Sequence, residues 1–88
     1  MRCNMDAGET RHIRLRIHST QDDPFVIRNA RYELLFGSNI VESGECTVTD
    51  HVMDVVVSPQ HGNSTYRLRY IYDIADETYV DIVEIAVR

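Results

Sequence analysis

The sequence contains no lysine, so all nine of its basic residues are arginines. This absence excludes Schiff-base lysine chemistry and a phosphate-binding P-loop, because both need a lysine side chain. No apolar run approaches the roughly 20 residues that a membrane-spanning helix needs. The first six residues also lack the apolar stretch of a secretory signal, so we expect synthesis in the cytoplasm.

Glycine, proline and cysteine are scarce, with four, two and two residues in a chain of 88. Two cysteines can form at most one bridge, whereas small secreted domains typically carry about two to four. We therefore expect Cys3 and Cys46 to be free thiols. The remaining composition, 43% hydrophobic and 26% charged, is typical of one ordinary folded domain.

Hydrophobic and polar residues alternate along most of the chain, which is typical of half-buried β-strands. In residues 12–18, for example, Ile13, Leu15 and Ile17 share one face. No segment has a convincing helical period, and residues 73–77 would form one turn at most. The alternation predicts strands over residues 12–18, 30–36, 40–42, 45–49, 52–57, 65–72 and 79–87.

Six or seven short strands separated by turn signals predict an all-β fold, an antiparallel β-sandwich. A small β-barrel is the alternative. Residues 1–10 show no hydrophobic period and are expected to form a flexible N-terminal arm, followed by a single domain over residues 11–88. The predicted core consists of Ile13, Leu15, Ile17, Tyr32, Leu34, Val55, Leu68, Tyr70, Val83 and Ile85.

Residues that favour turns or loops lie between the predicted strands at three places. The run Gln21–Asp22–Asp23–Pro24 predicts a turn, because the residue before a proline avoids helix and aspartates favour turns. Polar loops are expected over residues 60–64 and 73–78.

Residues with metal-binding or catalytic chemistry are present, but their spacing does not indicate a site. His12 and His18 lie about 20 Å apart along one strand, so they cannot share a metal ion. No Gly-x-Ser-x-Gly elbow is present. Asp50, His51, Asp54 and His61 lie in or near two loops that could converge, but they do not have the spacing of a closed zinc site. We expect a non-enzymatic protein without a metal or cofactor.

The run Tyr66–Arg67–Leu68–Arg69–Tyr70 interleaves aromatic and basic residues, as RNA-binding strands do. Strand alternation, however, places its tyrosines and its arginines on opposite faces. We expect the arginines to pair with carboxylates of a neighbouring strand. The net charge of −5 also disfavours contact with a phosphate backbone, so a nucleic-acid-binding β-barrel is the alternative function.

Charge is divided unevenly along the chain. Residues 1–31 carry a net charge of +2 and residues 32–88 a net charge of −7. This asymmetry can orient head-to-tail packing between copies. It is also compatible with local pairing between neighbouring strands, which we favour.

A series of turn and core residues is spread over residues 22–70, just over half of the chain. It consists of Asp23–Pro24, Arg31–Tyr32–Glu33–Leu34, Val41–Glu42–Ser43–Gly44, Asp50–His51 before a valine-rich strand, Pro59, and Tyr66–Arg67–Leu68. This cadence resembles the small immunoglobulin- and transthyretin-like sandwich modules of spike, baseplate and peptidoglycan-associated proteins in contractile injection systems. His51 departs from it, because those modules usually have a glycine in that turn. The resemblance implies a structural or docking role in a larger assembly, with no catalytic residues.

The last predicted strand is apolar on both faces, although a strand in a two-layer sandwich needs only one apolar face. Two explanations stay open for the second face. Either residues 25–27 fold across it, or a protein partner, including another copy, covers it. The predicted interaction residues are Phe25, Val26, Ile27, Val80 and Ile82.

Overall fold

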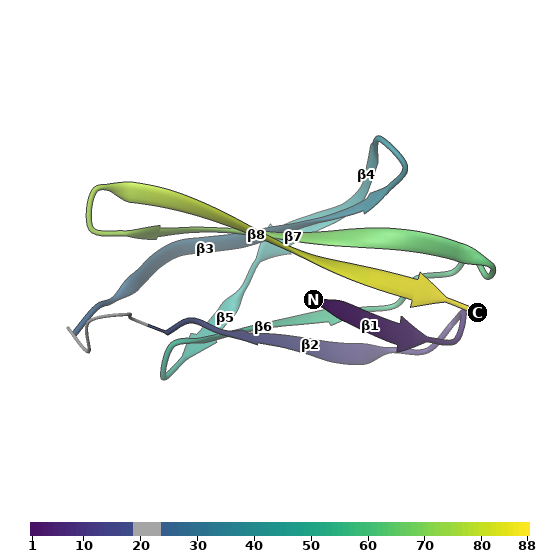
Figure 1. Ribbon diagram of the computed structural model, residues 1–88, viewed down its shortest axis with the longest axis horizontal. Helices are drawn as coiled ribbons and strands as arrows, with labels where there is room; N and C mark the ends of the chain where they lie inside the picture. The colour runs from purple at the N-terminus through teal and green to yellow at the C-terminus, as the bar shows by residue number, and fades with distance from the viewer. Residues whose placement is uncertain (19–23) are drawn as a thin grey trace.

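The computed structural model describes residues 1–18 and 24–88, and these form strands and turns without a helix (Figure 1). Two sheets pack on each other. The large sheet has the strand order β1-β8-β7-β3-β4, and the small sheet has the order β2-β6-β5. The strands are β1 (Arg2–Met5), β2 (Arg11–Arg16), β3 (Ile27–Phe36), β4 (Asn39–Glu45), β5 (Thr47–Thr49), β6 (Val52–Val57), β7 (Ser64–Ile74) and β8 (Glu77–Val87).

The predicted all-β, sandwich-like fold is confirmed, with eight strands rather than six or seven. Strand alternation sends one set of side chains from each sheet into the space between them. Of the predicted core, Ile13, Leu34, Val55, Leu68, Tyr70, Val83 and Ile85 are buried, whereas Leu15, Ile17 and Tyr32 are partly buried and pack against them. Both cysteines are free, as expected.

The N-terminal residues do not form the expected arm. Arg2–Met5 is β1, which pairs in parallel with the end of β8, and the Met5 side chain is only 1% exposed. The Met5 carbonyl accepts a hydrogen bond of 2.9 Å from the backbone N–H of Arg88. The prediction failed because the strand has only two inward residues, Cys3 and Met5, and too few alternations to show a period.

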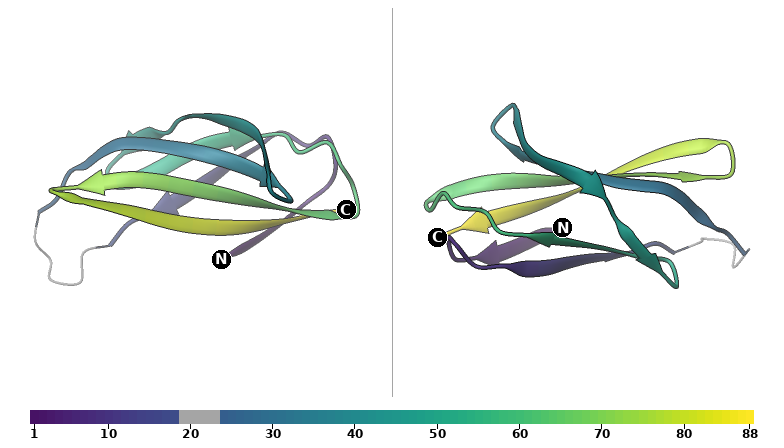
Figure 2. Two further views of the ribbon diagram at one scale, coloured as in Figure 1. Left: turned by 90° about the horizontal axis from the view of Figure 1, so that it is seen from above. Right: turned by 180° about the vertical axis from the view of Figure 1, so that it is seen from behind.

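The chain changes sheets between β4 and β5. The backbone N–H of Cys46 donates a 3.0 Å hydrogen bond to Ala30 of β3, and β5 then joins the small sheet. A β-bulge lies between Leu34 and Leu35, which face Glu42 and Ile40 and leave Val41 without an opposite residue. β4 and β5 therefore form the edges of the two sheets on the same side of the molecule (Figure 2).

The connection expected over residues 73–78 is shorter than predicted. β7 and β8 form a hairpin in which Ile74 lies opposite Glu77, with only Ala75 and Asp76 between them. Ala75 has a positive φ of 54°, as tight hairpin turns require. Of the turn expected over Gln21–Pro24, residues 21–23 lie outside the described residues.

Candidate interaction surface

Three aliphatic side chains form a small cluster on the outer face of the large sheet. Ile71 of β7 lies directly opposite Val80 of β8, and Ile82 follows on the same face. Val80 is 53% exposed and Ile82 46% exposed, while Ile71 is half-buried. The alternation that turns Tyr70, Tyr72 and Val83 inward turns these three residues outward. We call Ile71, Val80 and Ile82 the outer apolar cluster.

Charged residues border the cluster. Arg69 lies opposite Ile82, and its guanidinium bridges to Glu33 of β3, with Nη2 2.6 Å and Nε 2.9 Å from Oε1. Glu84 lies two residues beyond Ile82 on the same face of β8. It is opposite Arg67 of β7 on one side and opposite Arg2 of β1 on the other. An apolar centre bordered by paired charges is the usual arrangement of a protein interface.

A hollow of about 510 Å³ adjoins the cluster, between the β1 edge and β7. It is lined by Met1, Arg2, Arg67, Ile82 and Glu84. Met1 is 68% exposed and adds an apolar side chain beside Ile82. The hollow and the cluster together form a continuous outer surface over β1, β8 and β7.

The structure does not bring the predicted interaction residues together. Ile27 begins β3 opposite Ile74 and is a core residue, 8% exposed. The Phe25 ring stacks on the ring of His51 with 3.9 Å between centroids. Phe25 and Ile27 thus face the interior. The alternative in which residues 25–27 fold across the last strand is wrong, because Ile27 enters the same sheet and turns inward.

Val26 is the exposed residue of this segment, at 63%. It lies at the end of the large sheet beside the β7–β8 turn, where it lines a hollow of about 400 Å³ with Arg28, Ile74 and Ala75 among others. Val80 and Ile82 do not line this hollow. Val26 is therefore separate from the outer apolar cluster. Ile71 was not among the predicted site residues, although its alternation with the β7 tyrosines already placed it on the outer face.

The interleaved tyrosines and arginines of β7 lie as predicted. Tyr66 and Tyr70 are buried, at 2% and 0% exposure, while Arg67 points outward and Arg69 pairs with Glu33. Burial in the core raises the pKa of the Tyr70 hydroxyl well above its usual range. The outer face of β7, which carries the arginines, has no tyrosine side chain on which bases could stack.

The titratable groups outside the cluster form local pairs. His12 Nδ1 lies 3.1 Å from Asp54 across the outer face of the small sheet, and Arg14 lies 3.5 Å from the same carboxylate. Burial raises the pKa of the Cys46 thiol to about 11, so it is protonated at neutral pH. Within the described residues, no three His, Cys, Asp or Glu side chains are placed to share a metal ion.

Comparison with protein families found no matching family, and neither the curated proteins nor the solved structures include a significant match to the chain. In residues 1–18 and 24–88, no helix is long and apolar enough to cross a membrane.

Proposed function

We propose that the protein is a non-enzymatic interaction module that docks onto another protein through the outer apolar cluster. The observation that carries the proposal is the exposure of Val80 and Ile82 side by side with Ile71 on a regular sheet face. Aliphatic residues on an outer strand face contribute strand propensity to the sandwich but bury only part of their surface in it. They gain free energy when a partner covers them.

The size of the cluster limits the strength of that contact. Fully burying an aliphatic side chain contributes about 1.5–3 kcal/mol, and these side chains are already half covered. The cluster therefore contributes a few kcal/mol, whereas association costs about 4 kcal/mol or more in lost freedom. A stable complex needs further contacts, and the surface over Met1, Arg2 and Arg67 lies where a partner would make them.

The assembly implied by the resemblance to contractile injection modules is part of this proposal. Its support is the cadence of turn and core residues, in which Tyr32 and Leu34 face the interior and Gly44 lies against the Tyr32 ring. The ideal Cβ position at Gly44 is 3.2 Å from Tyr32 Cε1. A glycine is thus favoured there by packing. We propose that the chain acts as a component or docking domain of such an apparatus.

A nucleic-acid-binding role is the second candidate, and one observation favours it. The outer face of β2 presents His12, Arg14 and Arg16, all exposed. Asp54 lies among these side chains, however, and compensates part of their charge. The strands β2, β5 and β6 contain no phenylalanine or tyrosine, so this face lacks the aromatic residues on which bases stack. Docking on a protein is the better supported function.

The test compares which proteins of the native host are captured by the wild type and by three surface variants. Val80→Asp and Ile82→Asp place a charge in the cluster, whereas Val56→Asp places one on the outer face of the small sheet. Val56 is a matched control because it is also 46% exposed, like Ile82. We expect a specific co-purifying protein to be retained by the wild type and Val56→Asp and lost by the two cluster variants, and the same loss to recur with that protein purified.

An identical set of captured proteins for all four chains would refute docking through the cluster. A titration with single-stranded oligonucleotides at low salt accompanies the capture. Binding that is lost in Arg16→Glu but retained in Ile82→Asp would favour the nucleic-acid role instead.

A further inference from the structure

The two sides of the sandwich carry opposite charge. On one side, residues 39–50 form β4, β5 and the following turn, and they contain three acidic residues and no arginine, namely Glu42, Glu45 and Asp50. On the other side, residues 11–18 form β2 and its extension, and they contain three arginines and no acidic residue. β4 and β2 are edge strands of their sheets, and they lie on opposite sides of the molecule (Figure 2).

The acidic edge is open along its whole length. All seven residues of β4 are exposed. Because the N–H of Cys46 points to Ala30 of β3, alternation along the strand directs the backbone groups of Glu45 and Ser43 away from β3. Such unpaired groups are a template for another strand.

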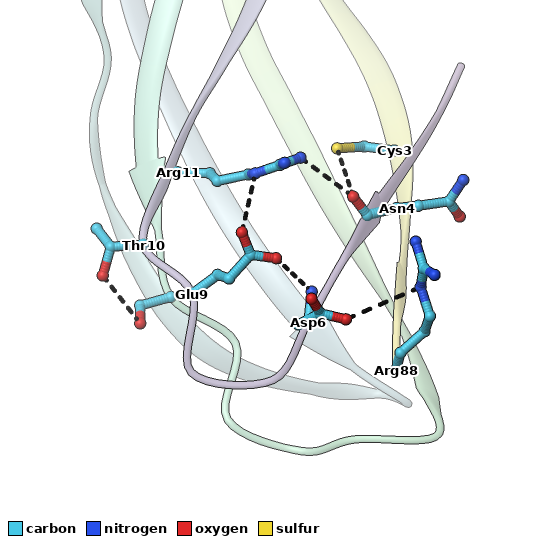
Figure 3. Close-up of polar contacts among 8 residues, drawn as sticks. Cys3, Asn4, Asp6, Glu9, Thr10, Arg11 and Arg88 are labelled. Carbon is cyan, nitrogen blue, oxygen red and sulfur yellow. Dashed lines mark hydrogen bonds and ion pairs between the residues drawn. The ribbon is translucent and has the colours of Figure 1, made fainter.

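The basic edge is open in the same way over its second half. The N–H of Ile17 donates a 2.9 Å hydrogen bond to His51, next to β6, so the backbone groups of Arg16 and Arg14 point away from the sheet. At the start of β2 the edge is closed instead, because Arg11 Nη1 donates a 3.1 Å hydrogen bond to the Asn4 carbonyl of β1 (Figure 3). The open part is thus the region of Arg14 and Arg16.

No ion pair of the described residues reaches the acidic edge. Arg31 of β3 lies opposite Glu45 but donates a hydrogen bond to the Asn29 carbonyl. The ion pairs of the described residues involve Asp6, Glu9, Glu33 and Asp54. The β4 carboxylates are not among them. Glu42 accepts a 2.7 Å hydrogen bond from the hydroxyl of Tyr32, which leaves its negative charge in place. The local pairing that we favoured from the sequence therefore accounts for only part of the charge asymmetry.

We propose that copies of this chain associate head to tail, with the β4 edge of one copy along the β2 edge of the next. An antiparallel alignment that places Glu45 opposite Arg14 also places Ser43 opposite Arg16. In this register the outward backbone groups of both strands face each other, and the carboxylate of Glu45 lies opposite the guanidinium of Arg14. The contact uses neither Val80 nor Ile82, so it is independent of the docking surface proposed above.

The two contacting surfaces are different, so the association is heterologous. Each copy keeps one free edge of each kind, and growth continues until a ring closes or a filament forms. A two-fold contact between two β4 edges would instead stop at a dimer and would bring the acidic residues Glu42 and Glu45 of both copies close together. Charge complementarity selects the head-to-tail arrangement.

The test is sedimentation velocity of the full chain at increasing concentration, in low and in high salt. Ser43→Pro removes an outward N–H of β4, and Arg16→Glu reverses a charge of β2. Arg88→Glu is the control, because it makes the same charge change at the exposed residue Arg88, away from β4 and from the open part of β2 at Arg14 and Arg16. Circular dichroism and thermal unfolding check the fold of each variant, and Glu45→Arg replaces Ser43→Pro if the proline disturbs it.

We expect the wild type and Arg88→Glu to form oligomers whose mass rises with concentration and falls with salt. Ser43→Pro and Arg16→Glu should each remain monomeric alone and form a dimer, and nothing larger, when mixed in equal amounts, since each retains the edge that the other lacks. A wild type that stays monomeric in low salt would overturn the proposal, as would a mixture that stays monomeric or an Arg16→Glu variant that still dimerises. Oligonucleotide binding by a monomeric wild type, lost in Arg16→Glu, would assign the basic edge to nucleic acid instead.

Discussion

The hydroxyl of Tyr70 in the large sheet donates a hydrogen bond of 2.7 Å to the backbone carbonyl of Ile13 in the small sheet. Tyr70 is completely buried, and its hydroxyl thereby joins the two layers of the sandwich. A buried tyrosine needs such a partner, because an unpaired hydroxyl in the core is costly.

Replacing Tyr70 by phenylalanine removes this bond and leaves the ring in place. We expect the free energy of unfolding to fall by about 1–2 kcal/mol, the usual range for a buried hydrogen bond. Urea denaturation measures the change. Tyr79→Phe is the control, because Tyr79 is 41% exposed and its hydroxyl donates a hydrogen bond to Glu77 at the surface. An equal loss in both variants would contradict a specific role for the contact between the sheets.

Met5 tests the N-terminal strand. It is 1% exposed, so Met5→Ala should reduce the free energy of unfolding by about 2–4 kcal/mol, as truncations in a core do. Val41→Ala, at a bulge residue that is 53% exposed, should change it by less than about 0.5 kcal/mol. Similar values for the two variants would mean that residues 1–10 are an arm after all.

The orientation of the last strand is tested by aspartate substitutions. Val80 and Ile82 point outward, so Val80→Asp and Ile82→Asp should each lower the free energy of unfolding by about 1 kcal/mol or less, mainly through lost strand propensity. Val83→Asp, at a residue 1% exposed, buries a carboxylate and should prevent folding or cost more than about 3 kcal/mol. Thermal unfolding distinguishes the two cases, and a collapse of Val80→Asp would make that residue part of the core.

His51 has a strained backbone conformation in a turn, and its ring contacts Phe25. Its φ is 66°, and its ring stacks on Phe25 and lies 2.8 Å from the Phe25 carbonyl through Nε2. His51→Ala keeps the strain and loses the contact, so we expect a loss of about 1–2 kcal/mol. His51→Gly relieves the strain and should be less destabilising. If denaturation curves show that His51→Gly is less stable than His51→Ala, this explanation is contradicted.

Alkaline pH should destabilise the fold through Cys46. Burial raises the pKa of its thiol from 9.0 to about 11. Below pH 9 the thiol is protonated in both the folded and the unfolded chain, so its contribution is fully present. As the pH rises toward 11 the unfolded chain ionises first and stability is lost. Cys46→Ala should not show this loss of stability between pH 9 and pH 11, because it has no thiol to ionise. The measurement is the difference in unfolding free energy between wild type and variant at pH 8 to 11, and a difference that does not change would contradict the burial of the thiol.

Local alternation was sufficient to predict the strands that form most of the core. Ile13 and Leu15 in β2, and Leu68 and Tyr70 in β7, lie in long alternating runs whose inward face can be read directly. β1 was missed because its inward residues, Cys3 and Met5, are too few to define a period.

The placement of Phe25 and Ile27 depends on pairing between distant segments. Ile27 lies opposite Ile74, and nothing in the short run 25–27 specifies that partner or the face. For Val80 and Ile82, the sequence correctly indicated a second apolar face on the last strand. Whether another part of the chain covers that face is decided by strand order, which local patterns do not contain.

The most direct test of docking through the outer apolar cluster is one ratio. It is the amount of a co-purifying host protein captured by Ile82→Asp divided by the amount captured by Val56→Asp, two variants whose parent residues are each 46% exposed. If the cluster is the docking surface, Val56→Asp captures the wild-type amount and the ratio falls far below one. A ratio of one, with both variants folded, would contradict the proposed function.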